Sequence, residues 1–247
     1  MGMESRPEAS DMRARVEEVR GRIEASAGRA GRDPREVTLV AVSKTHPPAF
    51  VREAFAAGLA DFGENRVQEA EEKIEELKGE APAARWHLIG HLQTNKARRA
   101  ARLFDLIHSV DSPALVERLE RVCEEESRET LGVLLQVDLA GEATKSGAGE
   151  SELPALVESL RSCVRVRCRG LMTLPPFFDD AELARPYFRR LRELRDELRG
   201  SGVFGAGAGE LSMGMSHDFE AAIEEGATLV RVGTAIFGER GRGPSAS

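Results

Sequence analysis

Short apolar segments alternate with amphipathic segments along most of the chain, and this alternation constrains the fold more than any other feature. Before residue 36 the pattern predicts one helix, over residues 7–29, which ends in the glycines of SAGRAGRDP. Eight later segments are typical of strands, and they cover residues 37–42, 60–63, 86–90, 106–110, 133–139, 164–174, 210–214 and 228–233. The intervals between them have helical periodicity, over residues 47–58, 65–78, 94–102, 113–127, 151–161, 181–199 and 216–226.

Helices that connect successive strands indicate a parallel sheet, and eight such units in about 200 residues predict a closed (β/α)8 TIM barrel with an extra N-terminal helix. An open doubly wound sheet is the alternative, but it usually has a glycine-rich turn after its first strand. Here that strand is followed by SKTHPP. We therefore expect residues 1–35 to be a helix and lead-in of the same domain, 36–240 the barrel, and 241–247 a disordered tail.

Composition excludes several classes of protein. The 247 residues carry a net charge of −7, and the arginines alternate with glutamates, as in RRLRELRDELR, so a nucleic-acid-binding face is not expected. No window approaches ~18 consecutive apolar residues, so we expect no membrane-spanning helix. The charged N-terminal segment does not resemble a signal peptide, and three cysteines outside any CxxC suit a reducing compartment. We expect a cytoplasmic monomer.

Lys44 is the first candidate for chemistry. It directly follows the first predicted strand, and residues at the carboxyl ends of barrel strands converge on one mouth. The chain has 30 Arg and only five Lys, and lysine, unlike arginine, can lose its proton and act as a nucleophile. The competing interpretation is a lysine whose amine extends to solvent or pairs with a carboxylate.

The last two units predict an anion site opposite Lys44. LSMGMSHDFEAAIEEG indicates a strand, a glycine turn and a helix beginning at Ser216, which would either cap the helix or help its N–H groups to bind an anion. Gly233 and Thr234 follow the last strand, where phosphate sites of such barrels commonly lie. An amine facing a phosphate site favours a phosphorylated carbonyl compound held as a Schiff base. Pyridoxal 5′-phosphate (PLP) is the commonest such cofactor, and phosphorylated sugars remain an alternative.

Six motifs in order resemble the pyridoxal phosphate homeostasis proteins, also called YggS-like proteins or proline synthase co-transcribed homologues. They are AVSKTHP, DFGENRVQEA, WHLIGHLQTNK, IHSVDS, GLMTLPP and SMGMSHDFEAAIEEGATLVRVGTAIFGER. That family has the barrel of the alanine racemase N-terminal domain. The resemblance implies that Lys44 binds PLP covalently as a Schiff base. It also implies that Ser216 and the backbone around Gly233 and Thr234 bind the phosphate, and that Arg231 faces the pyridine nitrogen. Further pocket residues that it suggests are Asn65, Ser212 and Met213.

The resemblance implies a protein that stores, buffers or delivers PLP, with apo forms of PLP-dependent enzymes as candidate partners. An amino-acid racemase of low activity is the alternative, and a regulator that acts through protein contacts is a third. Racemisation needs an acid or base on each face of Cα, and in the racemases a tyrosine of a further domain supplies the second. The single tyrosine here, Tyr187, lies in the predicted helix 181–199. His91 and Asp111 are the nearest titratable candidates, and neither is aimed at Cα by the sequence.

His87 and His91 form an H-x3-H pair, a spacing that binds metal when it lies on a helix. WHLIG is instead typical of a strand, and no third ligand is evident. We therefore expect no metal site, with one histidine packed inside and the other at the mouth.

Overall fold

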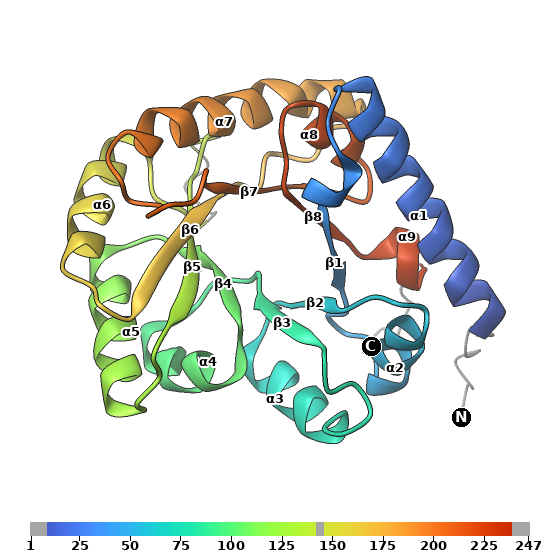
Figure 1. The fold of residues 1–247 in the computed structure, drawn as a ribbon, viewed down its shortest axis with the longest axis horizontal. Helices are drawn as coiled ribbons and strands as arrows, with labels where there is room; N and C mark the ends of the chain where they lie inside the picture. The colour runs from blue at the N-terminus through green and yellow to red at the C-terminus, as the bar shows by residue number, and fades with distance from the viewer. Residues whose placement is uncertain (1–8, 142–145, 239–247) are drawn as a thin grey trace, which may run out of the picture.

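Eight parallel strands close into a barrel in chain order, and β1 pairs with β8 to complete it (Figure 1). The computed structural model describes residues 9–141 and 146–238, so Lys145 and the tail expected at 241–247 lie outside the described residues. The strands are β1 (Thr38–Val42), β2 (Asp61–Glu64), β3 (Arg85–Leu88), β4 (Leu106–Val110), β5 (Leu131–Gln136), β6 (Val166–Met172), β7 (Glu210–Met215) and β8 (Leu229–Val232). The predicted TIM barrel is confirmed.

The helices surround this barrel, as Figure 1 shows. In the described part of the chain the α-helices are α1 (Ala9–Arg29), α2 (Pro48–Ala56), α3 (Val67–Glu76), α4 (Ala97–Leu103), α5 (Pro113–Glu125), α6 (Leu153–Arg161), α7 (Arg185–Arg199), α8 (Phe219–Glu224) and α9 (Thr234–Phe237). Short 3-10 turns are η1 (Pro34–Glu36), η2 (Thr94–Lys96), η3 (Glu150–Glu152) and η4 (Ala181–Ala184). Among the α-helices just given, α9 is the one that the sequence did not predict, because four residues are too few to establish a helical period.

The extra N-terminal helix α1 packs along the outside of the barrel beside α8 and α9 (Figure 1). Its buried side chains recur every three or four residues, which places them on one face of the helix: Met12, Val16, Val19, Ile23 and Ala27. Two ion pairs of 2.7 Å, Arg22–Glu220 and Arg29–Glu224, join its polar side to α8. The helix therefore covers apolar surface of the last two barrel units.

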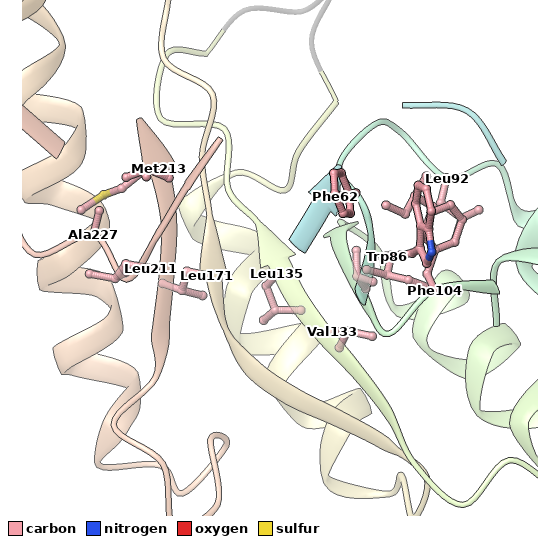
Figure 2. Packing of buried hydrophobic residues seen from close by; sticks show 14 of the residues in the cluster. Phe62, Trp86, Leu92, Phe104, Val133, Leu135, Leu171, Leu211, Met213 and Ala227 are labelled. Carbon is pink, nitrogen blue, oxygen red and sulfur yellow. The ribbon is translucent and has the colours of Figure 1, made fainter. Parts of the chain in front are cut away.

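The apolar core has two layers because side chains alternate between the two faces of each strand. The larger layer lies between the strands and the helices, and it includes Phe62, Trp86 and Phe104 (Figure 2). The smaller cluster joins side chains of β8 and β1 to side chains of β4, β5 and β6 on the other side, so it must lie inside the barrel: Val40, Leu106, Leu134, Met172 and Leu229. The rest of the interior includes buried polar groups, and these position the site described below.

Helix α8 begins at Phe219, which corrects the prediction that it begins at Ser216. Residues 216–218 form a turn, and Asp218 is the residue that precedes the helix. The Asp218 carboxylate accepts a hydrogen bond of 2.6 Å from the Met215 N–H and so closes that turn. Gly214, with φ of 90°, leads into it; a Cβ there would lie 2.6 Å from the Ala222 side chain, so only glycine fits.

Candidate functional site

A cavity of about 300 Å³ opens at the carboxyl ends of the strands, between β1, β7 and β8. This volume is at the lower end of the range for small-molecule sites, which is roughly 300–1,000 Å³. Several residues predicted from the sequence line it together: Lys44, Asn65, Ser216, Arg231, Gly233 and Thr234. The structure therefore brings the lysine at the end of the first strand to the same space as the loops that follow the last two.

Ser212 and Met213 do not line this cavity. They are consecutive residues of β7, so their side chains point to opposite faces of the strand. Met213 points outward and packs in the layer beneath the helices, where Ala227 also lies (Figure 2). Ser212 points into the barrel, is fully buried, and accepts a hydrogen bond of 2.5 Å from Arg231. The interpretation of Met213 as a pocket side chain therefore conflicts with the strand geometry, and Ser212 reaches the site only through Arg231.

Other cavity residues carried no chemical signal in the sequence. The walls include apolar side chains at or just after strand ends: Val42, Ile89, Leu174 and Met215. The rim includes three rings on loops: His46, Phe177 and His217. Phe177 is 73% exposed, and its ring centroid lies 5.4 Å from that of His217. Strand-end position alone could have identified the apolar group.

The backbone directly after Lys44 is held in an uncommon conformation. The next residue, Thr45, has φ of 67°, in the left-handed region, which costs a residue with a Cβ roughly 1 kcal/mol. Its N–H donates a hydrogen bond to the Glu69 carboxylate. On the other side of Lys44, the Ser43 hydroxyl donates to Glu64 at 2.7 Å. The main chain is thus fixed on both sides of the lysine.

Lys73 of α3 joins these contacts behind the strand. Its Nζ donates to the Ser43 carbonyl at 2.7 Å, to Glu64 at 2.7 Å and to Glu69 at 2.9 Å. Lys73 and Glu64 are 4% and 0% exposed, so this is a buried ion pair. Burial raises the pKa of Glu64 despite the nearby ammonium. Burial also acts to raise the pKa of Glu69, but hydrogen bonds from Lys73 and the Thr45 backbone outweigh it and leave that pKa lowered.

Arg231 lies inside the barrel and ends at the cavity. It is 3% exposed, and its guanidinium donates to the Ser212 hydroxyl and, at 2.9 Å, to the Thr173 carbonyl. Burial lowers its pKa to about 10, which still leaves it protonated at neutral pH. The cavity therefore has a positive charge at one wall. Among the described residues, no three or more His, Cys, Asp or Glu side chains are grouped so that they could hold a metal ion.

The loops after β7 and β8 are joined by one hydrogen bond. The Gly233 N–H donates to the Ser216 hydroxyl at 3.1 Å. Ser216 is not the cap of α8, because Asp218 is the residue that precedes that helix. Thr234 is exposed and begins α9. This end of the cavity presents a hydroxyl pair and backbone N–H groups, which are donors suited to an anion.

The remaining candidates lie elsewhere. His87 is buried inside the barrel, and half-exposed His91 lies 3.7 Å from the carboxylate of Asp111. Neither His91 nor Asp111 lines the cavity, whereas His46 and His217 do, which corrects the expectation about nearby titratable groups. Tyr187 lies on α7 and stacks on Phe178, outside the barrel. No helix within the described ranges has the length and apolar character needed to cross a membrane.

Comparisons with known proteins identify relatives over most of the chain. The family described as alanine racemase, N-terminal domain, matches residues 16–241. The pyridoxal phosphate homeostasis protein of Pseudomonas aeruginosa is 48% identical over 236 residues, which cover 94% of this chain and 97% of that protein. The protein of the same name from Aquifex aeolicus is 45% identical over 226 residues, covering 92% of this chain and 97% of its own.

Solved structures are similar to this chain over most of its length. PipY of Synechococcus elongatus, solved with PLP bound, is 42% identical with a TM-score of 0.81, over 92% of this chain and 100% of that one. Alanine racemase of Corynebacterium glutamicum is 19% identical with a TM-score of 0.62, over 90% of this chain and 61% of the racemase, and shares the fold. The chain therefore belongs to the alanine racemase N-terminal domain family and, within it, to the pyridoxal phosphate homeostasis proteins.

Proposed function

We propose that this protein binds PLP as a Schiff base on Lys44 and stores, buffers or delivers it without a robust reaction of its own. The observation that carries the proposal is the meeting of Lys44, Arg231 and the Ser216–Gly233 pair in one cavity. The PLP-bound structure of PipY, at 42% identity, supports it. So do the names of the close relatives, which describe homeostasis and no reaction.

The residues present fit the groups of PLP. The phosphate needs hydrogen-bond donors, and the hydroxyls of Ser216 and Thr234 would supply them at the end of the cavity where Gly233 also lies. The flat ring needs apolar walls, and the aldehyde needs a primary amine, which is that of Lys44. Arg231 is the cation that would face the ring nitrogen.

When bound, PLP supplies an aldehyde that condenses with an amine and a ring that can accept electrons. In that setting Lys44 would be the attacking amine, and the contacts of Ser43 and Thr45 hold the residues on either side of it. Arg231 only donates hydrogen bonds and stays protonated at neutral pH. It would therefore leave the ring nitrogen without a proton, which makes the ring a weak electron acceptor. This favours holding PLP over catalysing reactions with it.

Transfer to an acceptor tests this function. Protein loaded with PLP and freed of excess cofactor is mixed with the apo form of a PLP-dependent enzyme, and acceptor activity is followed over time. We expect activity to appear, with loss of the protein's own near-visible absorbance. An acceptor that regains activity no faster than with an equal amount of free PLP, while the absorbance stays unchanged, would argue against delivery.

We also propose that the protein acts as a monomer in the cytoplasm, where its three unpaired cysteines would stay reduced.

Two side-chain truncations separate the phosphate site from fold stability. Ser216→Ala removes the acceptor of the Gly233 N–H, so we expect a cost of about 0.5–1.5 kcal/mol in the free energy of unfolding, together with weaker PLP binding. Thr234→Ala removes an exposed hydroxyl without a hydrogen bond to any described residue, so stability should change by less than about 0.5 kcal/mol while PLP affinity falls. Chemical denaturation and PLP titration measure the two effects. Unchanged PLP affinity in both variants would remove Ser216 and Thr234 from the phosphate site.

Proton exchange at Cα tests the absence of racemase activity. We expect L-alanine to keep its α-proton in deuterated water with the PLP-loaded protein, because a base on each face would have to contribute about 10²–10⁴-fold and no tyrosine lies at the cavity. NMR of the α-proton measures this. Exchange at several turnovers per second, lost in Lys44→Ala, would contradict the prediction. His46→Gln and His217→Gln would then identify the second base, since both histidines line the cavity.

A further inference from the structure

A chain of buried polar side chains crosses the barrel interior from the cavity to the opposite end. Arg231 donates to the Ser212 hydroxyl, which lies 2.9 Å from His108 Nδ1; His108 Nε2 lies 2.9 Å from His87 Nδ1. His87 Nε2 lies 2.9 Å from the Asp61 carboxylate. Each of these side chains is at most 6% exposed. The His108–Ser212 contact joins β4 to β7, which are not neighbours, so the chain passes through the interior.

The two ends of the chain constrain the direction of its hydrogen bonds. Arginine can only donate, and an ionised carboxylate can only accept. If Ser212 accepts from Arg231 and donates to His108 Nδ1, then His108 carries its proton on Nε2 and donates to His87. His87 then carries its proton on Nε2 and donates to Asp61. This arrangement gives the Ser212 hydroxyl and both ring N–H groups an acceptor and leaves both rings neutral, so it adds no second buried cation beside Arg231.

The environment of each end supports this direction. Among the described residues no carboxylate forms an ion pair with Arg231, whose acceptors are the neutral Ser212 hydroxyl and Thr173 carbonyl. Asp61 is held by Arg85 at 2.8 and 2.5 Å. Burial acts to raise the pKa of Asp61, but the bonds from His87 and Arg85 outweigh it, so the carboxylate stays ionised. Burial also drives the pKa of His108 well below its usual value, which favours the neutral ring.

We propose that His108, His87 and Asp61 are positioning residues that act through Ser212 to hold the Arg231 guanidinium in one orientation toward the ring nitrogen of the ligand. The chain links a buried cation to a distant carboxylate, and hydrogen bonds aligned in one direction strengthen one another in a low-dielectric interior. This inference rests on the proposed function for the identity of the ligand. The arrangement of protons in the chain does not depend on it.

The arrangement of protons is tested on the protein without PLP. Nitrogen-15 NMR of the imidazoles reports the protonation state and tautomer of each ring. The protein has five histidines to assign. We expect His87 and His108 each to carry a proton on Nε2 and none on Nδ1. An imidazolium at His87, or a proton on Nδ1 of His108, would overturn the proposed direction. This result stands whether or not the protein binds PLP.

The action on Arg231 is tested by binding. His108→Leu breaks the hydrogen-bonded chain. Ser109→Ala is the matched control, since it removes from the next residue a buried hydroxyl that has no hydrogen-bond partner among the described residues. We expect His108→Leu to weaken PLP binding about tenfold. It should weaken binding of 1-deazapyridoxal 5′-phosphate, which has carbon at the ring-nitrogen position, less than twofold. Ser109→Ala should weaken neither.

Equal losses for the two ligands would mean that the chain only supports the fold, and would overturn the proposal. If His108→Leu does not fold, Asp61→Asn keeps the shape of the terminal acceptor but removes its charge, and it should again weaken PLP more than the deaza analogue. Equal affinities of wild type and Asp61→Asn for both ligands would also overturn it. Failure of the wild type to bind PLP at all would instead reject the proposed function, and the NMR result would be unaffected.

Discussion

Replacing Lys44 with alanine is expected to abolish covalent attachment of PLP. In the wild type, PLP should give a near-visible absorbance band, and borohydride reduction should fix the pyridoxyl group on Lys44. The reason is geometric: the amine follows β1 and shares a cavity with Arg231 and the loops after β7 and β8. Lys44→Ala should lose the band and the reduced adduct, while some PLP stays bound through the phosphate contacts, which are separate from the amine.

Peptide mapping by mass spectrometry after reduction measures this outcome, and Lys96→Ala is the control. Lys96 ends the turn η2 and does not line the cavity, so its removal should leave both the band and the adduct unchanged. A pyridoxyl group found on Lys96 or Lys145 of the wild type would contradict the assignment. So would a Lys44→Ala variant that keeps the full band.

Most of the strands could be predicted from the sequence because they bury alternating or continuous apolar residues between turns. The prediction for β4, residues 106–110, has the bounds that the structure gives, and β6 is shorter than predicted by two residues at each end. The barrel then brought Lys44 together with Gly233 and Thr234, because the carboxyl ends of parallel strands share one edge. The roles of these residues toward PLP stay predictions.

Features that depend on atoms distant in sequence could not be predicted. Serine and aspartate both favour the position before a helix, so the sequence did not show that Asp218, and not Ser216, precedes α8. Alternation along β7 does imply that Ser212 and Met213 face opposite sides, and this signal could have excluded Met213 from the cavity. The His108–Ser212 contact, by contrast, joins residues 104 positions apart across a barrel whose register the sequence does not give.

Lys73→Met is expected to cause the largest loss of stability among these variants, about 3–5 kcal/mol at pH 7. The substitution keeps most of the buried side-chain volume but removes the ammonium. It leaves the Glu64 carboxylate with a buried charge and, among the described residues, only the Ser43 hydroxyl as a donor. Lys78→Met is the matched control. Lys78 is 76% exposed and lies 3.9 Å from Glu75, so its loss should change the free energy of unfolding by less than about 0.5 kcal/mol.

The pH dependence identifies the cause of this loss. Burial already raises the folded-state pKa of Glu64, and removing Lys73, which lowers it, should raise it further. The folded variant therefore binds a proton at a higher pH than the unfolded chain, whose glutamate pKa is about 4.3. The penalty should be complete above the folded-state pKa and shrink as pH falls through it, because protonation removes the buried charge. Denaturation of wild type and Lys73→Met from pH 8 to pH 5 should show the two stabilities converge, and adding Glu64→Gln to Lys73→Met should recover most of the loss at pH 7. A deficit that is constant with pH and unaffected by Glu64→Gln would instead assign the loss to packing around the methionine.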